Sequence, residues 1–105
     1  MTPTDIDGIL EYANILYIII EVKFGGAPLP YGQELALRRL TDDLGKVKKS
    51  ILIIAEHETH YEDNIIVHEC NVTRYRTNGQ WEEADGSQSV KEMCDWFIQK
   101  VKAEI

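Results

Sequence analysis

The sequence predicts a single mixed α/β domain in which a sheet of about five strands is flanked by helices. Two apolar stretches, 4–12 and 15–23, are separated by a two-residue break, and this spacing indicates an antiparallel hairpin. A helix predicted over 31–45 follows, and then a wholly apolar run at 51–55 that is typical of a strand buried in a parallel arrangement. This order predicts that the first helix crosses over between the second and third strands.

The predicted helix has clear boundaries and a clear apolar face. Prolines at positions 28 and 30 prevent the sheet from continuing through the loop 25–30, and Gly45 is a plausible stop. Leucines and a valine recur at 3-4-3 spacing, which predicts one buried stripe. The residues of this stripe are Leu37, Leu40, Leu44 and Val47.

The second half of the chain predicts a long strand, a tight hairpin and a final helix. The strand is expected over 65–76, and Asn78-Gly79 predicts a two-residue turn into a short strand at 80–82. Across this hairpin, Tyr75 and Trp81 are expected to form a packing pair. The final helix begins with a capping box, Ser89 followed by Glu92, and its expected buried face consists of Val90, Cys94, Phe97 and Val101, with Trp96 near the margin.

Length and composition describe an ordinary globular domain. With 105 residues, 44% hydrophobic and 28% charged, the chain is expected to form one domain over residues 1–105. The longest apolar run is too short to span a membrane, and no signal peptide precedes the core, so no membrane association is expected. Cys70 and Cys94 lack metal-ligand spacing, which suggests reduced thiols in the cytoplasm.

The net charge of −7 argues against a protein that holds nucleic acid through a broadly basic surface. It leaves a metal-dependent nuclease possible, because bound cations reverse the local field where carboxylates cluster. The basic residues are grouped at 38–39, 46–49 and at Arg74 with Arg76, where they could form a local phosphate track or simply a solvated face.

The candidate site comes from the first hairpin. Asp7 opens one apolar run, and Glu21-Val22-Lys23 closes the next. Because side chains alternate across a strand, Glu21 and Lys23 point to one face. A carboxylate and an amine at the end of a buried strand are costly to desolvate unless the site uses them, and metal-assisted phosphoryl chemistry would use both. Gln33 falls four residues before Leu37, so it lies at the start of the helix's apolar stripe.

The spacing of Asp7 before Glu21-Val22-Lys23, with a hairpin between and a helix after, resembles the PD-(D/E)XK nuclease superfamily, which has the restriction-endonuclease-like fold. The phrase 31–37, Tyr-Gly-Gln-Glu-Leu-Ala-Leu, is similar to the helix that follows the motif in that superfamily, where a glutamine often faces the active site. The sequence of residues 4–8 looks like that of short phage- or prophage-encoded members of the superfamily. The resemblance covers about residues 4–56.

The resemblance implies a magnesium- or manganese-dependent deoxyribonuclease. Asp7, Glu21 and the backbone carbonyl of Val22 would offer oxygen ligands to one ion. Lys23 would orient a water or stabilise the charge of the transition state, and Gln33 would position the water or a phosphate. The resemblance also implies DNA as substrate and the cytoplasm of a bacterial or phage-infected cell as location.

Each residue also has a simpler interpretation. Asp7-Gly8 is a common turn pair, Glu21 and Lys23 could form an ion pair at the sheet margin, and Gln33 could cap the helix. Asp5 and Glu11 lie on the same side of the strand as Asp7 and could extend the ligand set or be solvated. The spacing of the histidines 57, 60 and 68 fits no zinc pattern, although His57 could contact substrate.

The chain departs from the superfamily at its N-terminus. Ile6 stands where a proline often precedes the acid, and only six residues precede Asp7, so the usual first helix is missing. A homodimer burying apolar surface near the first hairpin or the last helix would cover the resulting open edge. The alternatives to an enzyme are a catalytically silent nuclease-like module that binds nucleic acid or a partner protein, and a small phage assembly or regulatory subunit.

Overall fold

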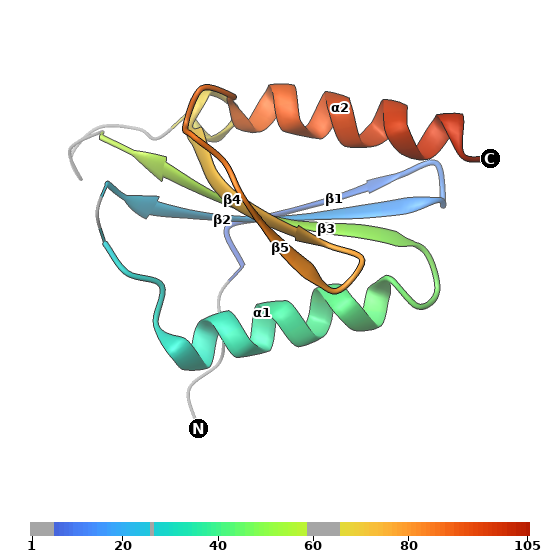
Figure 1. The fold of residues 1–105 in the computed structure, drawn as a ribbon, viewed down its shortest axis with the longest axis horizontal. Helices are drawn as coiled ribbons and strands as arrows, with labels where there is room; N and C mark the ends of the chain where they lie inside the picture. The colour runs from blue at the N-terminus through green and yellow to red at the C-terminus, as the bar shows by residue number, and fades with distance from the viewer. Residues whose placement is uncertain (1–5, 26, 59–65) are drawn as a thin grey trace.

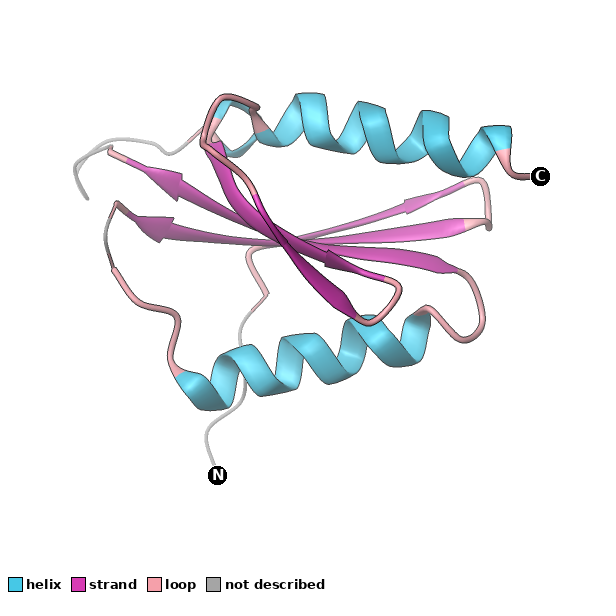
Figure 2. Cartoon of the chain, viewed as in Figure 1, coloured by secondary structure: helices cyan, strands magenta, loops and turns pink. Residues whose placement is uncertain are grey.

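The computed structural model describes residues 6–25, 27–58 and 66–105 and places one mixed sheet between two helices. Helix α1 covers one face of the sheet and α2 the other (Figure 1, Figure 2). The elements in chain order are β1 (Gly8–Tyr12), β2 (Leu16–Phe24), α1 (Tyr31–Leu44), β3 (Lys49–His57), the 3-10 turn η1 (Val67–Glu69), β4 (Asn71–Thr77), β5 (Gln80–Glu83) and α2 (Val90–Ala103). This confirms the predicted mixed α/β class with five strands in the described part of the chain.

The strands lie side by side in chain order, from β1 to β5. β2 and β3 are parallel and α1 connects them, while every other neighbouring pair is antiparallel. The predicted crossover between the second and third strands is therefore confirmed. Within the described ranges, no helix is long and apolar enough to cross a membrane.

The predicted two-residue turn at 78–79 is present, since Thr77 pairs with Gln80, whereas three residues, 13–15, separate the paired residues Tyr12 and Leu16 of the first hairpin. Ala13 and Asn14 have φ values of 50° and 62°, and Asn78 and Gly79 have values of 55° and 75°. Positive φ at both central residues is the signature of the type I′ turn, whose twist matches that of the strands it joins. The register of the β4–β5 hairpin therefore follows from a local signal, whereas the extra residue Ile15 shifts the β1–β2 register by one residue from that of a two-residue loop.

The sheet buries apolar side chains on both faces. On the α2 face, Ile18, Ile20, Ile51 and Ile53 pack against the buried side of α2. The predicted stripe of α2 is buried as expected, and the capping box forms, with the Ser89 hydroxyl accepting from the backbone N–H of Glu92. On the α1 face, the smaller cluster consists of Ile19, Leu37, Leu52 and Ile54.

The buried stripe of α1 differs from the prediction at two positions. Leu37 is buried and Leu44 packs against the core, but Leu40 is 36% exposed and Val47, which lies beyond the end of the helix, is 81% exposed. Thr41 is buried instead. Its hydroxyl donates to the backbone carbonyl of Leu37 at 2.8 Å, so a polar side chain is satisfied within the helix and can face the sheet.

The strand predicted over 65–76 is wrong in its first half. Residue 65 lies outside the described residues, residues 67–69 form the turn η1, and β4 begins only at Asn71. The pairing of β4 with β3 ends where Asn71 meets Glu56, and the described residues 66–70 take no part in that ladder. A sequence pattern that is typical of a strand does not form sheet where no other strand pairs with it.

The predicted packing of Tyr75 on Trp81 is also wrong. Trp81 is paired with Arg76, so Trp81 and Tyr75 lie on opposite faces of the β4–β5 hairpin. Tyr75 instead meets Trp96 of α2 edge-to-face, with ring centroids 5.8 Å apart.

Candidate active site

Three predicted residues form a closed polar cluster between β2 and the first turn of α1. Glu21 and Lys23 lie on the face of β2 that α1 covers, and the Lys23 Nζ is 3.0 Å from Glu21 Oε1. Gln33 Nε2 donates to the same Glu21 oxygen at 2.9 Å, and Lys23 Nζ donates to Gln33 Oε1 at 3.1 Å. The N-cap residue of this helix is Pro30, which makes no side-chain cap hydrogen bond, and the Gln33 amide joins Lys23 and Glu21 of β2.

The fourth predicted residue, Asp7, reaches the cluster through the hairpin. The pairing of Gly8 with Ile20 places Asp7 opposite Glu21, one position beyond the end of the β1 ladder. Its Oδ2 accepts a hydrogen bond from the backbone N–H of Val22 at 2.7 Å. Asp7 lies in a bend before the strand, as the turn interpretation expected, but its side chain also ties the start of β1 to β2.

Glu21 is the electrostatic centre of the cluster. It is only 2% exposed, and burial raises the pKa of its carboxyl above the ordinary value, while the hydrogen bond from Lys23 opposes this rise. The negative charge of Asp7 raises the same pKa further, so the two carboxyls are electrostatically coupled. Within the described residues, Glu21 Oε2 is buried without a hydrogen-bond partner.

An unpartnered buried carboxylate oxygen is costly, and a cation beside it would remove that cost. The described part of the chain holds no group of three or more His, Cys, Asp or Glu side chains that could bind a metal ion. Mg²⁺ fits this arrangement, because it is commonly held by one or two carboxylates and keeps several waters. The N–H of Val22 points toward Asp7, and in an extended strand the carbonyl of the same residue faces the same edge, so Val22 fits as a third oxygen ligand.

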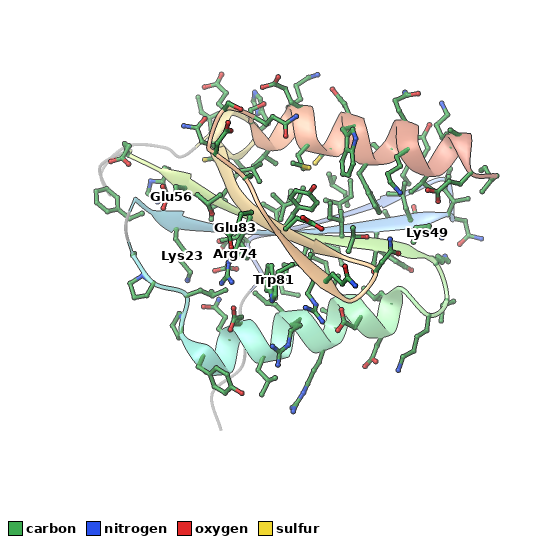
Figure 3. The ribbon with its side chains drawn as sticks, in the orientation of Figure 1. Lys23, Lys49, Glu56, Arg74, Trp81 and Glu83 are labelled. Carbon is green, nitrogen blue, oxygen red and sulfur yellow. The ribbon has the colours of Figure 1, made fainter. Side chains whose placement is uncertain are left out.

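The arginines on β4 do not form the open phosphate track that their grouping suggested. Arg74 Nη2 lies 2.8 Å from Glu34 Oε1 of α1, and its guanidinium lies over the Trp81 ring at 4.2 Å. Arg76 bonds both carboxylate oxygens of Asp42, at 3.0 and 2.8 Å. Figure 3 shows Lys23, Arg74 and Trp81 on the same side of the sheet, toward α1. These arginines therefore join the sheet to the helix.

Glu56 is a neighbour of the cluster that the sequence interpretation missed. The apolar run predicts a strand over 51–55 only, but β3 continues to His57 and pairs Glu56 with Lys23. Paired residues of parallel strands share a face, so Glu56 belongs to the same sheet face as Lys23. The available signal was an acid placed directly after the apolar run 51–55, which matches the position of Glu21 after its own apolar run.

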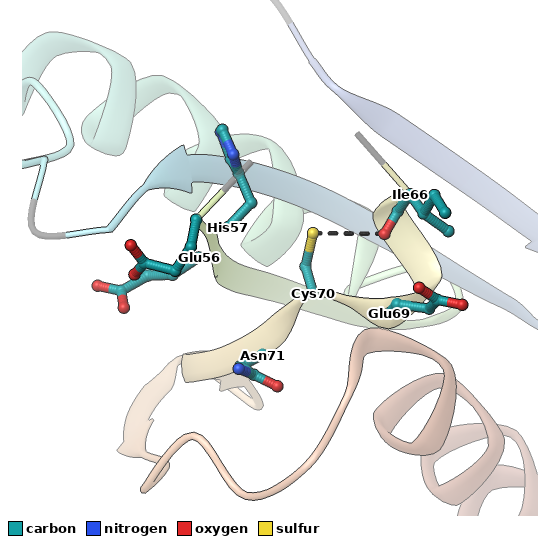
Figure 4. A pocket seen from close by; sticks show the side chains of 7 residues that line it. Glu56, His57, Ile66, Glu69, Cys70 and Asn71 are labelled. Carbon is teal, nitrogen blue, oxygen red and sulfur yellow. Dashed lines mark hydrogen bonds between the residues drawn. The ribbon is translucent and has the colours of Figure 1, made fainter. Parts of the chain in front are cut away.

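The other candidate ligands lie elsewhere. His57 contacts Phe24 edge-to-face and lines a cavity of about 290 Å³ with Cys70. Figure 4 shows His57 and Cys70 at this cavity, with the Cys70 thiol directed at the backbone carbonyl of Ile66. Cys70 belongs to the core on the α2 face and Glu56 also lines this cavity, so the cavity lies at the end of β3.

Two further predictions concern the acids and histidines around the motif. Glu11 accepts a hydrogen bond from the Asn14 N–H at the far end of β1, so it does not join Asp7. His68 is an exposed residue of η1. Asp5 and His60 lie outside the described residues.

Comparisons with protein-family models, with curated proteins and with solved structures give no match for this chain.

Proposed function

We propose that this chain is a metal-dependent nuclease with a restriction-endonuclease-like core, and that it hydrolyses phosphodiester bonds in DNA at the Asp7, Glu21, Lys23 and Gln33 cluster. The observation that carries the proposal is the Glu21 carboxylate. One of its oxygens is bound by Lys23 and Gln33, and the other is buried with no partner in the described chain, on a residue whose neighbour across the hairpin is another acid.

Each residue of the cluster would have a distinct role in hydrolysis. Asp7, Glu21 and the Val22 carbonyl would hold Mg²⁺ or Mn²⁺, which when bound polarises the scissile phosphate and lowers the pKa of a coordinated water. Lys23 keeps its ammonium at the site through Glu21 and is 23% exposed, so it can reach a phosphate oxygen and stabilise charge that develops there. Gln33 holds both partners in place and can turn its amide toward a water.

DNA is proposed as the substrate because the motif resembles that of DNA-cleaving enzymes, while the acidic chain makes binding depend on the cation. A net charge of −7 repels phosphates unless the carboxylates are neutralised. The free thiols Cys70 and Cys94 are both buried and fit a reducing cytoplasm, in a bacterial or phage-infected cell.

A second candidate function is a catalytically silent module that binds nucleic acid or a partner protein. It is favoured by the closed triangle of Glu21, Lys23 and Gln33, in which Lys23 and Gln33 bond one Glu21 oxygen and each other without any ligand. In this case the cluster only joins β2 to α1.

A plasmid-nicking assay separates the two candidates. Wild-type protein should nick supercoiled DNA in Mg²⁺ or Mn²⁺ and be inactive in EDTA, and Lys23→Ala should reduce the rate by about 100-fold or more. Lys46→Ala is the matched control, because Lys46 is exposed and lies at the other end of α1. Absence of nicking by the wild type, or equal nicking by Lys23→Ala, would refute the catalytic assignment.

A further inference from the structure

The two edges of the sheet differ in how they are protected. β5 has four residues and carries Glu82 and Glu83, and charged, short edge strands discourage pairing with another chain. β1 pairs only with β2 among the described residues. Its side chains Ile9 and Leu10 are 55% and 46% exposed, so this edge is apolar and unprotected.

An apolar groove lies beside this edge on the α2 face. It has a volume of about 550 Å³ and is lined in part by Leu10, Ile20, Val90 and Cys94. Gly8 is paired with Ile20, which lines the groove, and has no side chain to cover it. A Cβ atom at Gly8 would meet Ile20 only at ordinary contact distances of 3.6 and 3.7 Å, so there is space above this position.

We propose that β1 pairs antiparallel with β1 of a second copy of this chain, and that the Tyr12 side chain of each copy covers Gly8 of the other. Tyr12 is paired with Leu16, so it lies on the α2 face, the same face as Gly8 and the groove. An aromatic side chain opposite an edge glycine is a favourable cross-strand arrangement.

Symmetry fixes the register of this pairing. A two-fold axis perpendicular to the sheet keeps each side chain on its own face, and paired residues must share a face, so one residue must pair with itself. Centring the axis on Leu10 pairs the whole strand, with Gly8 opposite Tyr12 and Ile9 opposite Glu11. A shift to Ile9 would place Asp7 opposite Glu11, and a shift to Glu11 would place two glutamates opposite each other, so charge repulsion disfavours both.

The arrangement also has a consequence that rests on the proposed function. The two-fold axis maps each face of the sheet onto the same face of the second copy. Both Glu21 clusters would therefore lie on the α1 side of one continuous sheet. Asp7 is three residues from the axis, which places the two Asp7 positions about 20 Å apart along the strand direction. Two sites on one face could act on the two strands of one duplex.

The first test is the mass in solution, which is independent of nuclease activity. Light scattering of the wild type should give twice 12.1 kDa, and a monomeric mass at about 100 μM would overturn the proposal. Leu10→Lys should give the monomer, and Gln80→Lys on the opposite edge should stay dimeric. Circular dichroism of both variants checks that they remain folded.

Cysteine cross-linking tests the register itself. Leu10→Cys should form an interchain disulfide on oxidation, because the two copies of residue 10 face each other across the axis. Ile9→Cys should fail to form one, because its two copies are offset by two residues and lie beyond about 7 Å between Cα atoms. The wild type, with only its buried cysteines, gives the background. Equal cross-linking at positions 9 and 10 would overturn the register.

Discussion

Removing the charge of Asp7 should abolish a stabilising effect of divalent cations. Mg²⁺ or Mn²⁺ would bind the folded chain through Asp7 and Glu21, and a ligand at about ten times its dissociation constant adds about 1.4 kcal/mol to the free energy of unfolding. The unfolding entropy of a 105-residue domain is about 0.22 kcal/mol/K, so the melting temperature should rise by about 6 °C.

The variant Asp7→Asn keeps an oxygen that can accept the N–H of Val22, so the hairpin contact survives while the anionic ligand is lost. Its melting temperature should not respond to the ion. Asp43→Asn is the matched control, because Asp43 is an exposed acid near the other end of α1. Melting followed by circular dichroism over a millimolar titration measures the effect.

Two results would refute the reasoning. A wild-type melting temperature that is indifferent to both ions would remove the support for a cation between Asp7 and Glu21. An equal rise in Asp7→Asn and the wild type would place the ion elsewhere. A rise without plasmid nicking would instead favour the binding module, since the metal site would exist without catalysis.

Three further predictions concern stability. Because burial raises the pKa of Glu21 above 4.5, the folded protein holds this proton more tightly than the unfolded chain, so stability should fall as pH rises from 4.5 through the folded-state pKa. Glu21→Gln should flatten that part of a urea-derived stability profile, and a profile parallel to the wild type would contradict the assignment. Ser89→Ala should lower the free energy of unfolding by about 1 kcal/mol, because the N–H of Glu92 loses its acceptor, whereas Ser89→Asp should retain the cap; equal losses in urea unfolding would contradict this. Arg76→Met should cost about 2 kcal/mol, because it leaves the Asp42 carboxylate without two charged hydrogen bonds; a double-mutant cycle with Asp42→Asn that shows no coupling would contradict it.

The parts of the fold that the sequence predicted depend on local interactions. The type I′ turns at 13–14 and 78–79 and the capping box of Ser89 and Glu92 each need only a few adjacent residues. The buried middle of β3, residues 51–55, was also predicted, because a wholly apolar run is buried on both faces whichever strands lie beside it.

The errors in the fold come from interactions between distant segments. The burial of Thr41 in place of Leu40 depends on how α1 lies on the sheet, and the Ser50 hydroxyl, which donates to the Thr41 carbonyl at 2.6 Å, helps to fix that position. The late start of β4 depends on where β3 stops offering pairs. Neither can be read from local periodicity.

The candidate site shows the same division. The convergence of Asp7 and Glu21 depends on the extra residue Ile15 in the first hairpin, because a two-residue loop would place Asp7 opposite Ile20. The shared face of Glu21 and Lys23 follows from strand alternation. The contact of Gln33 with both needed only that α1 pack back on β2. The position of Glu56 beside Lys23 required the β2–β3 register, which local pattern does not specify.

Asp7 directly precedes the edge strand β1, whereas Glu21 lies in the internal strand β2, and this difference affects how the cluster could open. β2 is bonded on both sides, whereas β1 is bonded only to β2 among the described residues, and residues 13–15 are the whole connection between them. Edge elements open at a lower free energy than the central strands. Detachment of β1 alone would carry Asp7 away and leave Glu21, Lys23 and Gln33 in place, so the two halves of the acidic pair would separate while the protein stays folded. The rate of amide hydrogen exchange along 8–12 would then report whether the cluster is intact. A ligand that bridges Asp7 and Glu21 would slow exchange in β1 and leave the exchange rate of β3 unchanged.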